Sequence, residues 1–408
     1  MTEPTSPAPP VAGRSVGDRW RATTLPYLLL RGGGQAAEFV GWLILARRLG
    51  TTGFGQLSVG VLICRYGGLV ADWGASIRGV RDVAGGRSAA TMRRLNRRRS
   101  WTTAVLAVVY VGATLALGYP RLAPLVAMLI GIGLNRDWIA LGQEKGGRSA
   151  LPTAVQGVLL ALLAIPSTPN TLAVAVAVAY GTGLALSIAL NPLPKPTGPA
   201  DGDDQVDGWM LFAVLSNQIL SSADTFMIAI MLSASSAGIY AAVYRLPNGW
   251  LALLVIIRGG LLPLATSLLH TDVEQFRELR KTSIRWGIRA GLVLVALIPV
   301  FFFLIPVLYG DDYRSGQWPA VLLLGATAIA TVGAPLHHLY LAFGDDRPYA
   351  WFLAAAAGAN VVANLALIPL FGLVGAGVAT LIANALLAAI LWRAVNGRLA
   401  TLEPAVAA

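Results

Sequence analysis

The chain has 408 residues, of which 56% are hydrophobic and only 12% charged, and its mean hydropathy is +0.65. A soluble globular protein carries about 25% charged residues, so this composition excludes water as the main solvent. The net charge of +11 lies between the hydrophobic runs, where basic residues normally fix the orientation of membrane spans, so no nucleic-acid partner is expected.

Hydrophobic stretches follow one another along the whole chain with short gaps between them. A spanning helix needs roughly 20 apolar residues. The first half offers six such stretches, at 24–46, 54–76, 101–118, 122–142, 149–166 and 171–191. The second half offers six more, at 210–232, 236–264, 286–309, 318–343, 348–370 and 373–396. We therefore predict an all-α integral membrane protein with twelve transmembrane helices.

The segments outside these spans divide the chain. Residues 1–23 are rich in Pro and polar residues, and we expect a disordered cytoplasmic tail there. Residues 192–209, rich in Pro, Gly and Asp, are predicted as a cytoplasmic linker between an N-lobe (24–191, helices 1–6) and a C-lobe (210–397, helices 7–12). Residues 398–408 form a second cytoplasmic tail.

Basic residues are distributed unequally between the two sides. The segment after the second span carries Arg78, Arg81, Arg87, Arg93, Arg94, Arg97, Arg98 and Arg99. The segment after the eighth span carries Arg277, Arg280, Lys281, Arg285 and Arg289. The opposite loops hold only Arg47, Arg48, Arg121 and Arg314. Positively charged loops stay inside, so we expect residues 77–100, residues 265–285 and both termini on the cytoplasmic side of a bacterial plasma (inner) membrane.

A weak internal repeat supports two lobes of six helices. The fourth span ends in the residues LGQEK (141–145) and the tenth in FGDDR (343–347), and both follow the order apolar, Gly, polar, acidic, basic. Gly55 at the start of the second span corresponds to Gly238 at the start of the eighth. Because six helices separate the copies, the lobes share one orientation and are related by a pseudo-twofold along the membrane normal, with a cleft between them.

Polar residues inside the spans mark the candidate functional positions. A charge in hydrocarbon costs about 2.5–3.5 kcal/mol or more, so each one must be paired, hydrated or used. The first span places Arg31, Gln35 and Glu38 on a single stripe, at positions i, i+4 and i+7. The seventh span, its repeat partner, has the same spacing in Asn217, Ser221 and Asp224.

The second span adds Arg65 and Asp72, again seven residues apart. The first two spans run antiparallel, so counting residues from their cytoplasmic ends gives the depth of each charged side chain in the membrane. Matching depths predict two crossed ion pairs, Arg31 with Asp72 and Glu38 with Arg65. These four residues could serve only as ion pairs between the first two helices. Alternatively, the arginines could exchange their carboxylate partners for an anionic substrate as the cleft opens and closes.

Other features predict no catalysis. The adjacent His337 and His338 point to different faces of one helix and make a poor metal pair, and the single Cys64 lies in an apolar run. The loops are too short to house a catalytic arrangement. We expect no catalytic residue, no metal site and no cofactor.

Four segments in this order carry a resemblance to a known family: ARRLGTTGFGQLSVGVLICRYGGLVADWGASIRGVRDVA, DWIALGQEKGGRSA, AGIYAAVYRLPNGW and NVVANLALIPLFGLVGAGVATLIANALLAAILW. They resemble the polysaccharide transporters, the lipid-linked oligosaccharide (O-antigen) flippases of the multidrug/oligosaccharidyl-lipid/polysaccharide exporter superfamily. The similarity covers nearly the whole chain, although no single motif is sharp.

The resemblance implies a MATE-like pair of six-helix bundles that alternate between inward-open and outward-open forms. The implied cargo is an undecaprenyl-pyrophosphate-linked oligosaccharide for O-antigen, lipopolysaccharide or exopolysaccharide. By position, Arg31, Arg65 and Arg245 would hold the phosphates, and Gln35 and Asn217 would join them in binding substrate. The chain departs from a plain anion trap because Glu38, Asp72 and Asp224 lie at the same depth, as coupling or ion-pair residues. A monomer is expected, with membrane lipids as partners and H+ or Na+ coupling left open.

Two other functions were weighed. A cation-coupled multidrug exporter of the same superfamily would use Glu38 or Asp224 for coupling, but several arginines would repel cationic drugs, so the flippase is preferred. A glycosyltransferase, ligase or polymerase of the same pathway would need a large loop on the outer face, which the sequence does not offer.

Overall fold

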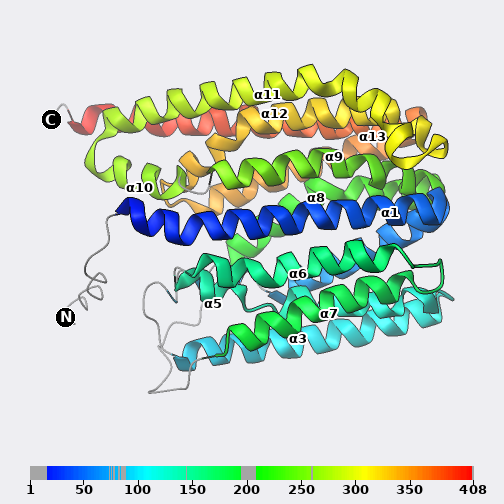
Figure 1. Ribbon diagram of the computed structural model, residues 1–408. Helices are drawn as coiled ribbons and strands as arrows, with labels where there is room; N and C mark the ends of the chain where they lie inside the picture. The colour runs from blue at the N-terminus through cyan, green and yellow to red at the C-terminus, as the bar shows by residue number, and fades with distance from the viewer. Residues whose placement is uncertain are drawn as a thin grey trace. The chain divides into compact units, whose positions relative to one another are not determined.

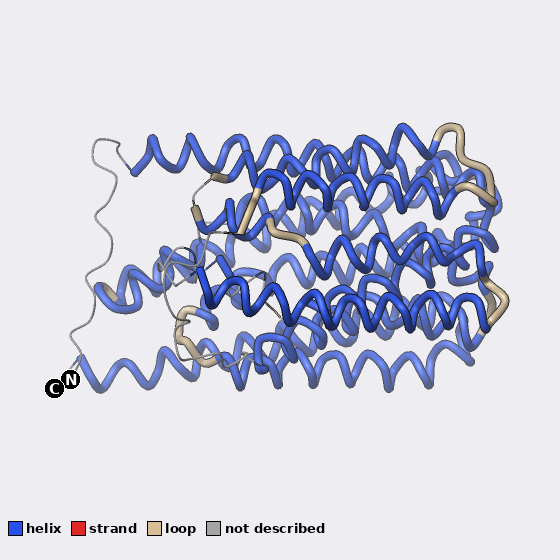
Figure 2. Tube along the Cα trace, turned by 90° about the horizontal axis from the view of Figure 1, so that it is seen from below, coloured by secondary structure: helices blue, strands red, loops and turns tan. Residues whose placement is uncertain are grey.

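The computed structural model describes residues 16–72, 74, 76, 79, 80, 83, 89–143, 145–193, 208–258 and 261–406. All regular elements in these ranges are helices (Figures 1 and 2). The chain forms two compact units. Unit 1 comprises Met1–Ile44 and Ile63–Asp207, and unit 2 comprises Leu45–Leu62 and Gly208–Ala408.

Unit 1 is built around the two arms of the first long helix. Its elements are α1 (Val16–Asp72, which lends residues 45–62 to unit 2), α3 (Ala89–Ala116), η1 (Pro120–Leu125), α4 (Val126–Leu134), α5 (Asp137–Gly142), α6 (Gly146–Ala164) and α7 (Leu172–Leu190). Helix α4 packs against α3 and α7, and α6 packs against α5 and α7. Glycines bring α1 and α6 into backbone contact, because a Cβ on Gly157 would collide with the carbonyl oxygen of Gly34.

Unit 2 is centred on α12. Its elements are α8 (Gly208–Met231), α9 (Ala234–Arg258), α10 (Leu261–Thr271), α11 (Val273–Tyr309), η2 (Asp311–Gly316), α12 (Gln317–Leu341) and α13 (Asp346–Val406). Helix α12 packs against α9, α10, α11 and α13. A core of buried side chains, including Phe276, Leu339, Tyr340, Leu353 and Leu391, fills the space between these helices.

Two long helices are broken by glycine. Gly50 inside α1 has φ 62°, and Gly372 inside α13 has φ 57°, a conformation that L side chains rarely adopt. Nine stretches of the described chain are long and apolar enough to cross a membrane. The stretches Leu25–Asp72 and Asp346–Thr401 have 48 and 56 residues, far beyond the roughly 20 that one crossing needs, so each accounts for two.

The all-α membrane fold is therefore confirmed. Helix α9, which occupies the predicted eighth span, is not among the nine stretches, so the total of twelve crossings remains a prediction.

Several helices are longer than the sequence indicated. Helix α1 begins at Val16, inside the segment expected to be disordered, and the rest of that tail lies outside the described residues. Helix α3 begins at Ala89 rather than 101, and α11 at Val273 rather than 286. Arg, Lys and Leu are good helix formers, and neither extension contains Gly or Pro before the predicted start, so the helix continues beyond the apolar stretch. The arginine-rich segments are thus helical rather than looped.

The tip of the first hairpin packs within unit 2. Thr51 Oγ1 accepts a 2.7 Å hydrogen bond from Ser235 Oγ, and the Ala46 carbonyl accepts one of 2.8 Å from Tyr313 OH. Next to these bonds Gly55 and Gly238 meet, and neither position has room for a side chain. Residues 45–62, which the sequence placed in the N-lobe, therefore contact the helices of the second half.

Candidate functional site

Glu38, in unit 1, accepts hydrogen bonds from uncharged side chains. Its Oε1 accepts hydrogen bonds from Trp42 Nε1 on the same helix (3.2 Å) and from the hydroxyl of Tyr180 on α7 (3.1 Å). The expected pair with Arg65 is not present in this structure. Depth counting places residues along a helix but does not fix its rotation: Cys64 is fully buried, whereas Arg65, one position further round, is exposed.

Asp72 is paired, but with a residue that the sequence did not single out. Its Oδ1 lies 2.5 Å from Nη2 of Arg99 on α3, and both side chains are buried. The backbone N–H and the hydroxyl of Ser76 also donate to this carboxylate, at 3.1 and 2.8 Å. The expected pair of Asp72 with Arg31 does not form. Because α3 begins early, Arg99 lies inside the bundle and not in a loop, which the hydropathy pattern concealed.

Arg31 has a different electrostatic partner. It is half-buried on α1, its guanidinium lies 5.8 Å from the centre of the Tyr27 ring, and it interacts electrostatically with Asp137. Asp137 is a buried carboxylate at the start of α5, bonded to the side-chain nitrogen of Asn135 at 2.9 Å. Gln35 is half-buried one turn beyond Arg31. Asp137 lies within the predicted span 122–142, which the structure divides into α4 and α5, and it was missed because no spacing pattern singled it out.

Unit 2 contains the most enclosed carboxylate of the predicted set. Asp224 on α8 has no exposed surface. Its Oδ2 accepts from Tyr240 OH on α9 at 2.6 Å and from Thr380 Oγ1 on α13 at 3.0 Å, and its Oδ1 accepts from the Thr225 N–H at 2.9 Å. No basic side chain of the described residues forms an ion pair with it. The two hydroxyl donors were missed because they lie on other helices, 16 and 156 positions away.

A cavity of about 180 Å³ is lined in part by Thr380, one of the hydroxyl donors to this carboxylate, although Asp224 itself does not line it. Its polar lining comprises Asn217, Ser221, Tyr244, His337, Thr380 and Asn384. Thr380 therefore connects the cavity to Asp224 through one hydroxyl. Of the predicted stripe on α8, Asn217 and Ser221 line the cavity, whereas Asp224, one turn further along, is fully buried and does not line it.

The remaining predicted residues lie elsewhere. Arg245 is half-buried on α9 with its guanidinium 5.3 Å from the centre of the Phe54 ring, and it does not line the cavity. His337 Nδ1 is 2.9 Å from Tyr349 OH, and His338 Nδ1 is 3.1 Å from the Ala334 carbonyl oxygen. Within the described ranges, no group of three or more His, Cys, Asp or Glu side chains could hold a metal ion.

No known family model matches the chain. Its structure is similar to an inward-facing multidrug resistance MATE family transporter of the MOP superfamily, with a TM-score of 0.63, 14% identity, and coverage of 91% of this chain and 96% of that one. The fold is that of a MATE transporter. The outward-facing form gives a TM-score of 0.62, also at 14% identity, over 95% of this chain and 96% of that one.

One curated relative carries the word flippase in its name. A protein of Haloferax volcanii named "Probable flippase AglR" is 25% identical over 208 residues. That match covers 48% of this chain, and the chain spans 42% of that relative's length. Both comparisons are in line with the resemblance to the multidrug/oligosaccharidyl-lipid/polysaccharide superfamily, and the chain is a multi-pass membrane protein with the fold of these transporters.

Proposed function

We propose that this protein moves a polyprenyl-diphosphate-linked oligosaccharide from the cytoplasmic to the outer leaflet by alternating access, as a monomer. The observation that carries the proposal is Arg65. It lies seven residues, or about 10 Å, from the end of α1 at Asp72, which places it inside a hydrocarbon layer about 30 Å thick. Its side chain is exposed and has no ion-pair partner among the described residues. A cation kept there without a carboxylate suits an anionic cargo.

The chemistry of the cargo fits a guanidinium. A diphosphate cannot enter hydrocarbon unaided, whereas its polyprenyl tail can stay in lipid. A planar guanidinium binds two phosphate oxygens at once, which an ammonium cannot do. Further candidates for substrate contact are Arg31, Gln35 and Asn217, which lie on candidate membrane spans, and Arg245, which lies on α9.

We assign coupling to Asp224. A fully buried carboxylate with no cationic side chain beside it is costly unless a proton or a bound monovalent cation neutralises it. Tyr240 and Thr380 supply hydroxyl groups that serve either state, and the adjacent cavity offers an entry path. Asp224→Asn keeps the shape of the side chain but cannot exchange a proton. We expect normal membrane levels and loss of the dependence of transport on an H+ or Na+ gradient.

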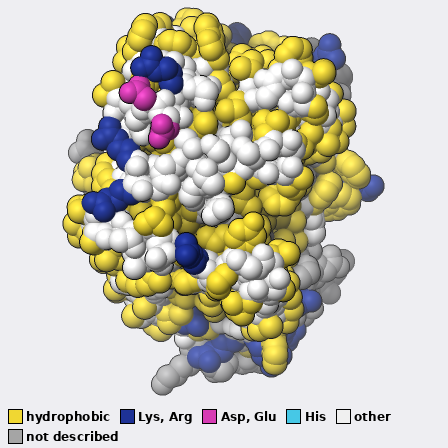
Figure 3. Space-filling view, turned by 90° about the vertical axis from the view of Figure 1, so that its right-hand side faces the viewer, with side chains coloured by type: hydrophobic (Ala, Val, Ile, Leu, Met, Phe, Trp, Pro, Cys, Tyr) yellow, Lys and Arg dark blue, Asp and Glu magenta, His cyan; other side chains and the backbone are white. Residues whose placement is uncertain are grey.

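The orientation rests on charge. The face of the molecule in Figure 3 shows mostly hydrophobic and uncharged side chains with few charged ones. We propose that the arginine-rich segment 77–100 and both termini are cytoplasmic. In a Cys64→Ala background, cysteines introduced at Arg94 or Lys281 should resist an impermeant reagent added to intact cells. Labelling of both would reverse the orientation.

The test of cargo uses proteoliposomes and a fluorescent polyprenyl-diphosphate sugar. Arg65→Lys should impair flipping although the charge is kept, and Arg65→Ala should abolish it. Arg121→Ala, which removes an exposed arginine at the other end of the same unit, is the matched control and should flip normally. Wild-type flipping by both Arg65 variants would remove this arginine from the cargo site.

A cation-coupled multidrug exporter is the second candidate, because the structurally similar proteins are titled multidrug resistance transporters. Efflux of a cationic dye, blocked by Asp224→Asn and unaffected by Arg65→Lys, would favour that function. Sugar-lipid flipping without dye efflux would favour the first.

A further inference from the structure

His337 on α12 contacts both the cavity of unit 2 and a hydroxyl group on α13. Its Nδ1 is 2.9 Å from the hydroxyl of Tyr349, and the two rings meet edge to face with their centroids 5.8 Å apart. The same histidine lines the cavity of about 180 Å³. The two nitrogens of an imidazole point in different directions, so His337 reaches from Tyr349 to the cavity.

Tyr349 leads from His337 towards the turn between α12 and α13. It stands one helical turn after Asp346, with which it interacts electrostatically. Asp346 is the first residue of α13 and is half-buried, close in sequence to the exposed Gly344 and Arg347. Water at this turn can therefore reach the carboxylate of Asp346, and Tyr349 connects that carboxylate with His337.

Thr380 connects the cavity with Asp224 on the other side. It lines the cavity, and its Oγ1 donates to Asp224 Oδ2 at 3.0 Å. Oγ1 also lies 3.0 Å from the carbonyl oxygen of Ala376, one turn earlier on α13. The single hydroxyl hydrogen can therefore point to an ionised Asp224, or turn to Ala376 while Oγ1 accepts a hydrogen bond from a protonated Asp224. This arrangement suits both states of the carboxyl group.

The cavity that His337 and Thr380 share has the size and the lining to hold water. A water molecule occupies about 30 Å³ in the liquid, and when buried it needs a few polar partners. The cavity volume of about 180 Å³ gives room for several molecules, and Asn217, Ser221 and Asn384 supply amide and hydroxyl groups. A chain of water molecules can therefore join His337 to Thr380.

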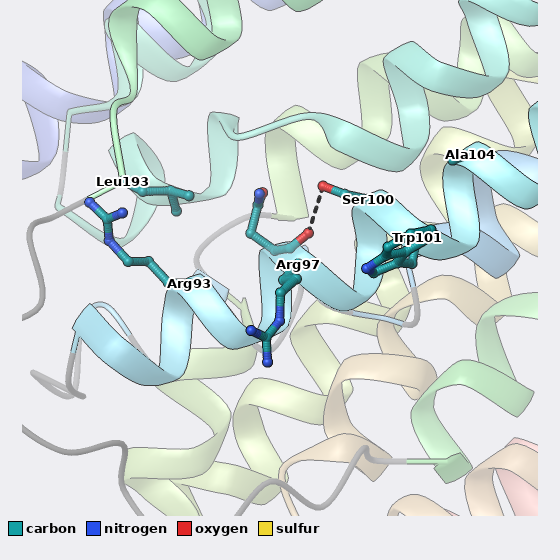
Figure 4. Close-up of a pocket in the computed structure, with 7 residues that line it drawn as sticks. Arg93, Arg97, Ser100, Trp101, Ala104 and Leu193 are labelled. Atoms are coloured by element: carbon teal, nitrogen blue, oxygen red, sulfur yellow. Dashed lines mark hydrogen bonds between the residues drawn. The ribbon is translucent and has the colours of Figure 1, made fainter.

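A hollow of about 470 Å³ on α3 of unit 1 provides a contrast. It is lined mainly by side chains of that one helix, among them Arg93, Arg97 and Trp101 (Figure 4). The hydrogen bond drawn there, 2.9 Å from the Ser100 hydroxyl to the Asn96 carbonyl oxygen, stays within α3. At the cavity of unit 2, by contrast, the bonds of His337 and Thr380 join α12 to α13 and α13 to α8.

We propose that Tyr349 and His337 form a proton path from the α12–α13 turn to Asp224, completed by water in the cavity and by Thr380. The path rests on the assignment of coupling to Asp224 in the proposed function, and it makes the coupling ion a proton. Histidine suits this role because its charge changes near neutral pH.

Each transfer along the path moves one proton. Tyr349 passes its hydroxyl proton to His337 Nδ1 and takes another from the turn at Asp346. The imidazolium releases its Nε2 proton to water in the cavity, and the ring then returns to its starting tautomer. Thr380 takes a proton from this water and gives its own to Asp224. Other titratable groups around the path include Tyr244, on the cavity wall, and Tyr340, stacked on Tyr349 at 6.3 Å.

Infrared difference spectroscopy of the purified full-length protein in sodium-free lipid vesicles, without cargo, tests the path. After a drop in pH, the carboxyl band that Asp224→Asn lacks reports protonation of Asp224. We expect it to form roughly 100-fold more slowly in His337→Ala and in Tyr349→Phe than in the wild type, with the same final amplitude. His338→Ala is the matched control, because this adjacent histidine lies 3.1 Å from the Ala334 carbonyl oxygen and does not line the cavity. It should be as fast as the wild type.

Two further arms keep the outcomes distinct. Added imidazole should restore the rate in His337→Ala, which has space for it, but not in Tyr349→Phe. Tyr349→Phe removes a single oxygen atom, so it decides the question if His337→Ala fails to fold. Wild-type rates in both variants would overturn the path alone, as would equal slowing in His338→Ala. A wild type in which no Asp224 band forms would remove the path together with the coupling assignment. Failure of the flipping assay would leave the infrared result standing.

Discussion

The buried carboxylates of the two units, Asp72 and Asp224, are stabilised by different kinds of partner. In unit 1, Asp72 is neutralised by a fixed partner, the buried guanidinium of Arg99. In unit 2, Asp224 is more deeply buried but is surrounded by hydroxyl and amide donors, with no ion pair in the described part of the chain. A carboxylate that is paired with a buried guanidinium stays ionised and serves a structural role. A carboxylate that is surrounded only by neutral donors can instead be neutralised by a proton or a cation that exchanges.

Asp72→Ala tests the structural role of the ion pair in unit 1 and is expected to have the largest effect. It leaves Arg99 buried without its partner, and breaking a buried ion pair costs about 3–5 kcal/mol of unfolding free energy. We expect a large fall in thermal stability in detergent and in membrane levels. The double variant Asp72→Ala, Arg99→Met should recover much of both, and equal instability of the double variant would mean that Asp72 acts through other contacts.

Tyr240→Phe tests the neutral donors around Asp224 in unit 2. It removes one of two hydroxyl donors to Asp224, so we expect a loss of about 1–2 kcal/mol, smaller than for Asp72→Ala because no unpaired charge is created. The ion dependence of transport should also shift. Tyr340→Phe is the control: this tyrosine is equally buried in unit 2 and bonds to no side chain of the described residues through its hydroxyl. Matching losses in both variants would contradict a role for the Asp224 bond.

The smallest effect is expected from Tyr180→Phe. Glu38 is only half-buried and keeps its bond to Trp42, so we expect a loss of about 0.5–1 kcal/mol. Thermal unfolding of the purified protein measures it, with Tyr119→Phe, an exposed tyrosine, as the reference. A loss as large as that of Tyr240→Phe would show that Glu38 is as enclosed in the membrane as Asp224.

The fold was predictable from sequence because apolar runs and their breaks are local signals. Each predicted span overlaps an observed helix, and the two breaks inside long helices fall on Gly50 and Gly372. Helix ends were less predictable, since the charged first turns of α3 and α11 read like loops although their residues favour helix. Because this part of α3 was expected to be a loop, Arg99 was not recognised as a partner of Asp72.

The partners of the candidate site residues were less predictable than their positions. The stripe of Asn217, Ser221 and Asp224 follows from helical spacing alone and was recognised. What surrounds Asp224 does not, because Tyr240 and Thr380 come from helices whose rotation is set by packing. The same holds for Arg65, whose depth was readable but whose exposure was not.

The contact of Gly55 with Gly238 is reciprocal. A side chain on Gly55 would strike the carbonyl of Ala234, four residues before Gly238, and one on Gly238 would strike the carbonyl of Thr51, four residues before Gly55. Each glycine therefore contacts the equivalent position on the other helix, which is the pattern of contacts across an isologous, twofold-symmetric dimer interface. A gene that doubled from a six-helix ancestor would inherit this contact from a homodimer of half-length chains.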